Sequence, residues 1–352
     1  MSRVLFDVSC LIPERISGIG VYTKHLFHSL ENLGVDLQPI VKGSRSFSKS
    51  SVSDHIGRTA KAYWPLLSDL QYPSRTIFHG PDFKLLAGTN AYKKVVTVHD
   101  LAVFHEGYNA PQFRKKGQQQ IEHLLKSKDP DAVITPTESV RNEFIERFPK
   151  YEGRTFAVHH GGNHLLEGPA ENLEPASIPY FLYVGHFENR KNLLNIISSF
   201  ELLHEKYKDF YLYLVGKDGY GSREIRKKIS NSPARSHIVD KGFVSDSDLK
   251  TLYSQARAFV FPSCYEGFGF PILEAMALRC PVITSNRGAM SEVAGDSAYL
   301  VDSSSPESIL EGLDFFSTDE TCRMAYILKG LERVEQFTWE KTARLVQELY
   351  QL

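Results

Sequence analysis

Short apolar runs rich in β-branched residues alternate with helical patterns along almost all of this 352-residue sequence. Most of the runs are too short for a buried helix and typical of a buried strand. Strands that alternate with helices form parallel sheets, because a parallel strand needs a crossover connection and a helix supplies it. The pattern therefore predicts the α/β class, with doubly wound sheets covered by helices on both faces.

The alternation is interrupted near the middle of the chain. Residues 166–179 contain Gly168, Pro169, Pro175 and Pro179, and this composition is typical of a linker. We predict two Rossmann-like domains, at 1–165 and 180–335, and a C-terminal helix at 336–352 that can cross back to the first domain. Two such domains in tandem direct the carboxyl ends of their strands toward a common cleft.

The same patterns give the individual elements. The strands expected in the first domain are Val4–Val8, Asp36–Val41, Thr76–His79, Val95–His99, Ala132–Thr135 and Thr155–His159. Those expected in the second are Tyr180–Val184, Tyr211–Val215, His237–Lys241, Ala258–Phe261, Val282–Thr284 and Ala298–Val301. Helices are expected at Val21–Leu33, Phe113–Lys126, Glu138–Phe148, Asn192–Lys206, Arg223–Ile229, Asp246–Ser254 and Pro271–Leu278.

Composition narrows the classes of function. A net charge of -1 gives no reason to expect a nucleic-acid partner. No apolar window approaches the length of a membrane span, and the first apolar run is too short for a secretion signal. We therefore expect a cytoplasmic protein that meets the inner face of the membrane only at its surface. The cysteines have no metal-type spacing and predict buried free thiols in a reducing compartment: Cys10, Cys264, Cys280 and Cys322.

The densest group of chemically informative residues runs from Glu266 to Glu274, between a predicted strand and a predicted helix. Its glycines, Gly267 and Gly269, allow the backbone to approach a ligand closely. Free amides at the helix start suit an anion such as a diphosphate. Glu266 lies in the loop and Glu274 in the helix, so they would reach two different parts of one extended ligand. A carboxylate accepts hydrogen bonds from adjacent sugar hydroxyls; the plainer alternative is a solvated Glu266 and a Glu274 paired with Arg279.

A second motif, Gly185 to Asn192, follows the predicted strand Tyr180–Val184 and leads into a helix. Arg190 and Lys191 at this helix start suit a diphosphate, which needs cations as the leaving group departs. The plainer alternative is an exposed basic helix start.

Together these motifs resemble glycosyltransferase family 4, whose members have the GT-B fold and retain the anomeric configuration of the sugar. The resemblance is carried by Phe261 to Ala277, by Pro281-Val282-Ile283 and by Glu292 to Gly295. It implies that Glu266 contacts the donor sugar and that Glu274 holds the ribose hydroxyls. The intervening residues implied to bind the donor are Gly267, Phe268, Gly269 and Phe270.

The resemblance also assigns roles elsewhere in the second domain. Arg190 and Lys191 would hold the diphosphate, beside Gly185. His186 stands where the family usually has arginine, and an imidazole is cationic only at mildly acid pH. Phe243 and Val244 would flank the nucleobase, and the loop from Gly216 to Gly219 would approach the donor.

In the first domain the resemblance points to two further places. Gly18-Ile19-Gly20 precedes a helix and is similar to a glycine loop over the diphosphate, although a plain turn explains it equally well. His99 ends the predicted strand Val95–His99 and would contact the donor sugar near the reacting centre. Asp100 either orients His99 or caps a helix, and His79 is a weaker candidate of the same kind.

No cofactor is expected, and no metal. The sequence Asp129-Pro130-Asp131 looks like an acidic metal motif, but Pro130 makes it a helix-to-strand boundary. We therefore expect a metal-independent enzyme with His99, Lys191 and Glu266 as its catalytic residues.

The expected activity is transfer of a hexose from a nucleotide-sugar to a glycan or lipid-linked acceptor. The combination of Ser17 to Gly20, Val98 to Leu101 and Arg190 to Asn192 resembles mannosyltransferases of surface-polysaccharide assembly, which favours GDP-mannose. The alternatives are a UDP-sugar-dependent transferase of the same family and a sugar-nucleotide-binding protein without turnover. A nicotinamide-dependent oxidoreductase is disfavoured because the dinucleotide fingerprint is missing.

Residues 43–75 lack a clear period. They combine basic side chains such as Arg58 and Lys61 with Tyr63 and Trp64. Cations and interfacial aromatics are what a membrane-docking segment needs. We expect this segment to contact a membrane surface; the plainer alternative is a loop that packs on its own domain.

Overall fold

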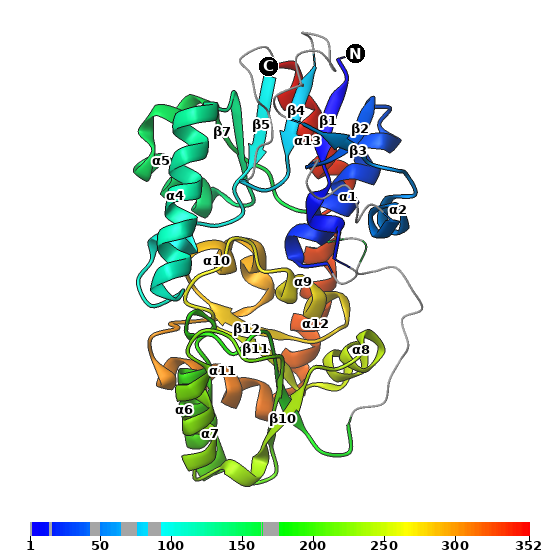
Figure 1. Ribbon diagram of the computed structural model, residues 1–352. Helices are drawn as coiled ribbons and strands as arrows, with labels where there is room; N and C mark the ends of the chain where they lie inside the picture. The colour runs from blue at the N-terminus through cyan, green and yellow to red at the C-terminus, as the bar shows by residue number, and fades with distance from the viewer. Residues whose placement is uncertain are drawn as a thin grey trace. The chain divides into compact units, whose positions relative to one another are not determined.

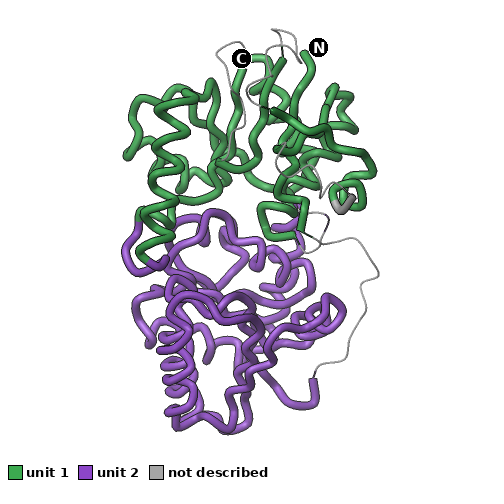
Figure 2. Tube along the Cα trace, viewed as in Figure 1, with its two compact units in different colours: residues 1–104, 111–161, 337–352 green, residues 105–110, 162–336 purple. Residues whose placement is uncertain are grey.

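The computed structural model describes residues 2–13, 16–42, 50–64, 76–83, 93–162, 164 and 176–352, with the side chains of 50 and 51 left out. The chain forms two compact units (Figure 2). Unit 1 comprises Met1–Phe104, Pro111–Gly161 and Phe337–Leu352, and unit 2 comprises His105–Ala110 and Gly162–Gln336. Residues 166–175 of the predicted linker 166–179 lie outside the described residues.

Unit 1 is built on a parallel sheet in the order β3-β2-β1-β4-β5-β6-β7 (Figure 1). The inner strands are fully buried, because helices cover both faces of a doubly wound sheet. The strands are β1 (Val4–Asp7), β2 (Leu37–Lys42), β3 (Lys61–Tyr63), β4 (Ile77–Gly80), β5 (Lys93–Thr97), β6 (Ala132–Thr135) and β7 (Thr155–Ala157). The helices are α1 (Gly18–Asn32), α2 (Ser50–Ile56), α4 (Pro111–Lys128), α5 (Glu138–Arg147) and α13 (Trp339–Gln351).

Unit 2 repeats this construction with a parallel sheet in the order β10-β9-β8-β11-β12-β13. The strands are β8 (Tyr180–Val184), β9 (Tyr211–Val215), β10 (Ile238–Gly242), β11 (Ala258–Phe261), β12 (Val282–Ser285) and β13 (Tyr299–Val301). The helices are α6 (Leu193–Lys206), α7 (Ser222–Asn231), α8 (Asp246–Gln255), α9 (Phe270–Ala277), α10 (Gly288–Ala294), α11 (Pro306–Thr318) and α12 (Glu320–Glu335).

Two segments belong to a unit other than that of their neighbours in sequence. The C-terminal helix α13 belongs to unit 1, where it packs against α1. Residues 105–110 follow β5 of unit 1 but belong to unit 2. The sequence-based prediction had placed all of residues 1–165 in the first domain. Aromatic packing anchors this segment, because the rings of His105 and Tyr108 lie 4.5 and 5.9 Å from the ring of Tyr265.

Two short elements were not predicted within residues 43–75, namely α2 and β3. Both are too short to produce a recognisable period. The predicted burial of all four cysteines holds only for Cys280, since Cys10 and Cys322 are half-buried and Cys264 is an exposed free thiol. Within the described chain, every helix is too short or too polar to span a membrane.

Candidate functional site

The predicted second-domain motifs meet where the strand order of unit 2 reverses. β8 and β11 are neighbours in the sheet although they are far apart in sequence. The loop 185–192 follows β8, and the loop 262–269 follows β11. Ligands of open α/β sheets bind outside the carboxyl ends of strands at such a reversal, so the fold gives these loops a position suited to ligand binding.

Glu266 is the centre of a buried ionic network in these loops. Its Oε2 accepts a hydrogen bond of 2.7 Å from Nη1 of Arg190, and its Oε1 pairs with Nζ of Lys191. Ser263 donates a further hydrogen bond of 2.9 Å to Oε1. The Glu266 side chain is only 12% exposed, so it is not the solvated carboxylate of the plainer alternative.

The network keeps the carboxylate charged. Burial alone would raise the pKa of Glu266, but the charges of Lys191 and Arg190 outweigh burial and hold the pKa below its usual value. Burial lowers the pKa of Lys191 against the attraction of Glu266. Two predicted catalytic residues, Lys191 and Glu266, are thus joined as an ion pair within unit 2.

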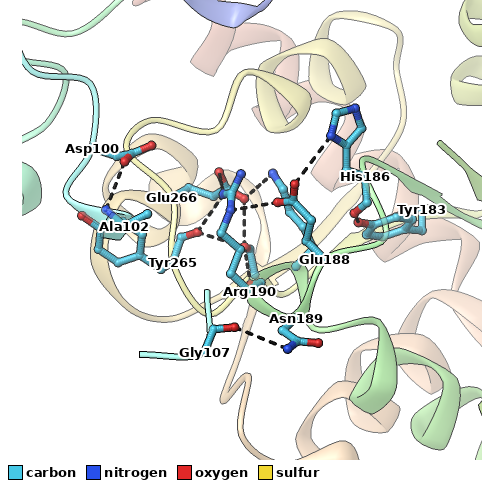
Figure 3. A network of polar contacts seen from close by, with 12 residues as sticks. Asp100, Ala102, Gly107, Tyr183, His186, Glu188, Asn189, Arg190, Tyr265 and Glu266 are labelled. Atoms are coloured by element: carbon cyan, nitrogen blue, oxygen red, sulfur yellow. Dashed lines mark hydrogen bonds and ion pairs between the residues drawn. The ribbon is translucent and has the colours of Figure 1, made fainter. Parts of the chain in front are cut away.

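Glu188 is a member of this network that sequence reasoning missed. Its Oε2 lies 3.0 Å from Nε of Arg190, and its Oε1 lies 3.6 Å from Nδ1 of His186. Figure 3 shows Arg190 between Glu188 and Glu266. The only signal in the sequence was an acidic residue inside a basic motif, which did not distinguish a partner of Arg190 from a solvated side chain.

The loop after β9, residues 216–221, supports the loop 185–192, called the basic loop below, through backbone pairing. The amide of Phe187 donates to the carbonyl of Lys217 at 2.8 Å, and the amide of Asn189 donates to the carbonyl of Tyr220 at 3.0 Å. These bonds continue the pairing of β8 with β9 beyond the ends of the two strands. The loop that carries Arg190 is therefore held by the protein itself.

Glycines make this close approach possible. A Cβ at Gly216 would lie 1.9 Å from the carbonyl oxygen of Gly185, and one at Gly221 would lie 1.9 Å from Oδ1 of Asn189. Gly221 also has a φ of 94°, which disfavours other residues. The close contact of this loop is thus with the basic loop, whereas the sequence had suggested a role for Gly216 to Gly219 toward the donor.

The start of α9 has the geometry that the motif predicted. Gly269 caps the helix with a φ of 104°, and a Cβ there would lie 2.6 Å from Cε of Met290. Gly267 and Phe268 are buried, and the ring of Phe268 packs edge-on against that of Phe270 at 5.1 Å. In this first turn Pro271 has no amide hydrogen, and the amide of Ile272 donates to the carbonyl of Gly269 at 3.0 Å. The property of the turn that suits an anion is therefore the positive end of the helix dipole.

Glu274 lies on α9 and is a second carboxylate that is largely removed from solvent, its residue being half-buried. Its Oε2 accepts a hydrogen bond of 3.3 Å from the hydroxyl of Tyr253. Burial raises the pKa of Glu274 above its usual value. The two predicted carboxylates therefore differ in environment: Glu266 faces cations, whereas Glu274 faces a hydroxyl.

The predicted base-flanking residues follow β10. Phe243 is 54% exposed, and Nζ of Lys217 lies 4.6 Å from its ring centroid. Val244 is half-buried beside it. Because more than half of the surface of this residue is exposed, Phe243 stays a candidate for contact with a planar base.

In unit 1 the strand order reverses between β1 and β4. The predicted glycine loop is wrong in form, because Gly18 and Gly20 belong to the first turn of α1. Gly20 is buried, and a Cβ there would lie 2.5 Å from Cβ of Ile16, so packing alone requires a glycine. Any contact of this segment with a donor would therefore involve the start of the helix.

His99 lies two residues beyond the end of β5, which stops at Thr97 and not at His99 as predicted. Its Nε2 lies 2.8 Å from the carbonyl oxygen of Pro81, and its Nδ1 lies 3.3 Å from Nε2 of His160. Burial lowers the pKa of His99. Asp100 accepts a hydrogen bond of 3.0 Å from the amide of Ala102, at the start of a short 3₁₀ turn, which supports the capping role.

The remaining candidates have structural partners. Asp129 contacts Lys150 and Arg154, and Asp131 accepts a hydrogen bond of 2.7 Å from the amide of Lys94. Among the described residues there is no group of three or more His, Cys, Asp or Glu side chains suited to a metal.

Most of the segment proposed to contact a membrane lies outside the described residues. Of those that the structure describes, Tyr63 is completely buried, so its interfacial role is wrong. It packs against Phe78 in the core of unit 1, at a ring distance of 4.8 Å. Arg58 forms an ion pair of 2.8 Å with Glu31, and Trp64 is 48% exposed.

The chain is similar to proteins of known class. A family profile described as glycosyl transferases group 1 matches residues 167–333. The O-antigen chain mannosyltransferase B of Escherichia coli is 30% identical over 290 residues, which cover 78% of this chain and 74% of that protein. The serotype-specific mannosyltransferase WbdA of Escherichia coli is 28% identical over 273 residues, which cover 73% of this chain but only 33% of WbdA.

Solved structures share the whole fold. Sucrose-phosphate synthase from Thermosynechococcus elongatus superposes with a TM-score of 0.72 at 18% identity, covering 100% of this chain and 98% of that one. A glycosyltransferase from Rickettsia africae gives a TM-score of 0.71 at 18% identity, covering 99% and 98%. These likenesses confirm the predicted GT-B class of two Rossmann-like domains.

Proposed function

Because the chain belongs to the glycosyl transferases group 1 family, we propose that this glycosyltransferase moves mannose from GDP-mannose to a glycan or lipid-linked acceptor with retention of configuration. The choice of mannose is supported by the relatives, whose names describe mannosyltransferases of O-antigen chains. UDP-sugars are the second choice of donor.

The observation that carries this proposal is the pairing of Glu266 with Lys191 and Arg190 at the strand reversal of unit 2. A leaving nucleoside diphosphate gains negative charge as the bond to the sugar breaks, and fixed cations stabilise that charge best in a water-poor site. Lys191 and Arg190 are such cations. Glu266 orients them before the donor binds and then accepts hydrogen bonds from the sugar hydroxyls.

Retention follows if the acceptor attacks the face of the sugar from which the diphosphate leaves. The bond from the anomeric carbon to the diphosphate oxygen breaks, and the bond from that carbon to the acceptor oxygen forms. The acceptor proton passes to an oxygen of the departing diphosphate. Glu274 holds the ribose hydroxyls, and His99 contacts the transferred sugar.

We also propose that no metal takes part, because the two cations supply the positive charge that a divalent metal supplies in other transferases. Transfer should therefore persist in a strong chelator. Loss of transfer in the chelator, restored by magnesium or manganese, would overturn this part of the proposal.

The donor is tested by thermal unfolding with GDP-mannose, GDP, UDP-glucose and ADP-glucose, since a ligand that binds only the folded chain raises its apparent stability. GDP-mannose should give the largest rise in Tm. The transferred sugar should then have the same anomeric configuration as in the donor, as measured by NMR of the product. A rise with UDP-glucose alone would favour the UDP-sugar alternative. Binding without transfer to any acceptor glycan would favour the non-catalytic alternative.

Membrane contact through residues 43–75 is a further part of this proposal, and among the described side chains it depends on the exposed Trp64 and Lys61. Wild type should sediment with anionic lipid vesicles, and Trp64→Ala should sediment less. Equal and negligible sedimentation of both would favour an acceptor that is not membrane-bound.

A further inference from the structure

Both ring nitrogens of His99 are contacted within unit 1. Nε2 lies 2.8 Å from the carbonyl oxygen of Pro81, and Nδ1 lies 3.3 Å from Nε2 of His160. His160 follows β7 and is only 1% exposed. No role for His160 was predicted from the sequence, and the proposed transfer reaction does not use it.

These contacts determine where the protons lie. A carbonyl oxygen only accepts hydrogen bonds, so Nε2 of His99 carries a hydrogen and donates it to Pro81. In a neutral imidazole the other nitrogen is an acceptor, so Nδ1 of His99 accepts the hydrogen of Nε2 of His160. A doubly protonated His99 would direct a second N–H at Nε2 of His160, and it would keep this bond only if His160 carried its hydrogen on Nδ1 instead.

The surrounding charges act in both directions. Burial lowers the pKa of His99, while the Pro81 carbonyl and the carboxylates of Asp82 and Asp100 raise it; the net direction is downward. Burial also places the pKa of His160 well below its usual value. The titratable groups that face His99 are His79 on β4, Asp82 after β4, Tyr22 on α1, His160 after β7 and Asp100 on its own loop.

The packing around His160 keeps its ring in place. The ring of Tyr22 lies 4.3 Å away, and the ring of Trp339, at the start of α13, is nearly parallel to it at 6.4 Å. A Cβ at Gly161 would lie 2.4 Å from the backbone nitrogen of Trp339, so the glycine allows α13 to approach this closely. The C-terminal helix thus supports His160, which in turn contacts His99.

We propose that His160 is a positioning residue that holds His99 as a neutral ring protonated at Nε2. This inference rests on the proposed function, in which His99 lies near the transferred sugar. Cleavage of a bond to an anomeric carbon passes through a transition state with positive charge on the sugar ring. A cationic His99 would repel that charge and raise the energy of the transition state, whereas a neutral His99 would not.

The test compares His160→Leu, which removes the N–H donor, with His160→Gln, which keeps an amide donor on a side chain of similar reach. The exposed His123 on α4, changed to Gln, is the control. The first readout is the nitrogen NMR spectrum of histidine-labelled protein, in which the His99 signals are identified by their loss in His99→Asn. The second readout is kcat and KM from pH 5.5 to 8.

Wild type, His160→Gln and His123→Gln should show His99 neutral and protonated at Nε2 at pH 7. In His160→Leu the His99 ring should take up a proton at higher pH than in wild type. Loss of one hydrogen bond should lower kcat about fivefold at pH 5.5, with KM nearly unchanged.

A wild-type His99 that is cationic or protonated at Nδ1 at pH 7 would overturn the proposal, as would a His160→Leu variant with wild-type ring signals and pH profile. If His160→Leu fails to fold, the wild-type and His160→Gln spectra decide. The NMR readout needs no turnover, so it separates failure of this inference from failure of the proposed transferase activity.

Discussion

At the residue scale, the ion pair between Lys191 and Glu266 determines what each side chain can do. Both are nearly buried, at 12% exposure of each side chain. A buried charge needs a partner, since removing it from water is costly. Before a donor binds, each serves as that partner for the other. A diphosphate that binds to Lys191 would replace part of this pairing and leave Glu266 available to sugar hydroxyls.

Lys191→Ala should therefore lower kcat about 100-fold or more, because it removes a cation that stabilises charge in the transition state. The donor Kd should rise much less, since Arg190 stays in place. Steady-state kinetics and donor titration measure the two effects. Lys329→Ala, at an exposed lysine that pairs with Asp296, is the matched control and should leave both values unchanged. Wild-type kcat in Lys191→Ala would contradict the assignment.

Glu274 should behave differently. Glu274→Gln should raise KM for the donor about tenfold with kcat largely retained, because hydrogen bonds between a carboxylate and ribose hydroxyls are formed equally in the ground and transition states. Tyr253→Phe is the control, since it removes the hydroxyl that donates to Glu274 and keeps the carboxylate. If kcat fell while KM stayed constant, Glu274 would belong to the chemical step and not to ribose binding.

At the element scale, the strand pattern was predictable from sequence because buried parallel strands have a strong compositional signal. β6, β8, β9 and β11 begin and end as predicted. The glycines after β9 show why the contacts between loops could not be predicted. Their sequence indicates close approach of something to the backbone, but only the three-dimensional structure identifies the neighbour as the loop after β8.

The same limit applied to His99. Its position near a strand end was predictable, and the contacts of its ring nitrogens were not, because Pro81 and His160 reach it from separate loops. Contacts between segments distant in sequence leave no local period. Glu188 was missed for a different reason: its partners His186 and Arg190 are only two residues away, but the turn of the loop that brings the side chains together leaves no sequence signal.

Gly221→Ala tests the supporting role of the loop after β9. A left-handed backbone costs a non-glycine residue about 1–2 kcal/mol, and the new Cβ would also collide with Asn189. We expect a lower Tm and a fall in kcat of about tenfold, as the basic loop shifts away from its productive geometry. Gly153→Ala is the control, because no atom lies within 4 Å of its Cβ position. Equal activity of the two variants would show that the loop tolerates displacement.

At the scale of the whole molecule, a buried histidine ties the C-terminal helix to the first sheet. Nδ1 of His79 on β4 lies 2.6 Å from the hydroxyl of Tyr350 on α13. His79 is completely buried, and burial lowers its pKa to about 3. The folded chain therefore keeps His79 neutral at pH values at which the unfolded chain protonates it.

The sign of the pH dependence follows from this difference. Above about pH 6.5, His79 is neutral in both the folded and the unfolded chain, and its contribution to stability is fully present. As the pH falls toward 3, only the unfolded chain takes up the proton, so the free energy of unfolding decreases by up to about 1.4 kcal/mol per pH unit. His99 and His160 have lowered pKa values for the same reason and act in the same direction.

His79→Gln removes one of these groups and should weaken the pH dependence without abolishing it. Chemical unfolding at pH 7 and at pH 5 gives the free energies, and the loss between the two should be smaller in the variant than in wild type by about 1–2 kcal/mol. The comparison between these two values avoids the range in which most carboxylates titrate. His123→Gln, at an exposed position, should keep the wild-type dependence. If His79→Gln and wild type lost equal stability between pH 7 and pH 5, His79 would take up its proton equally in the folded and the unfolded chain, and the buried link between α13 and the first sheet would not depend on a neutral histidine.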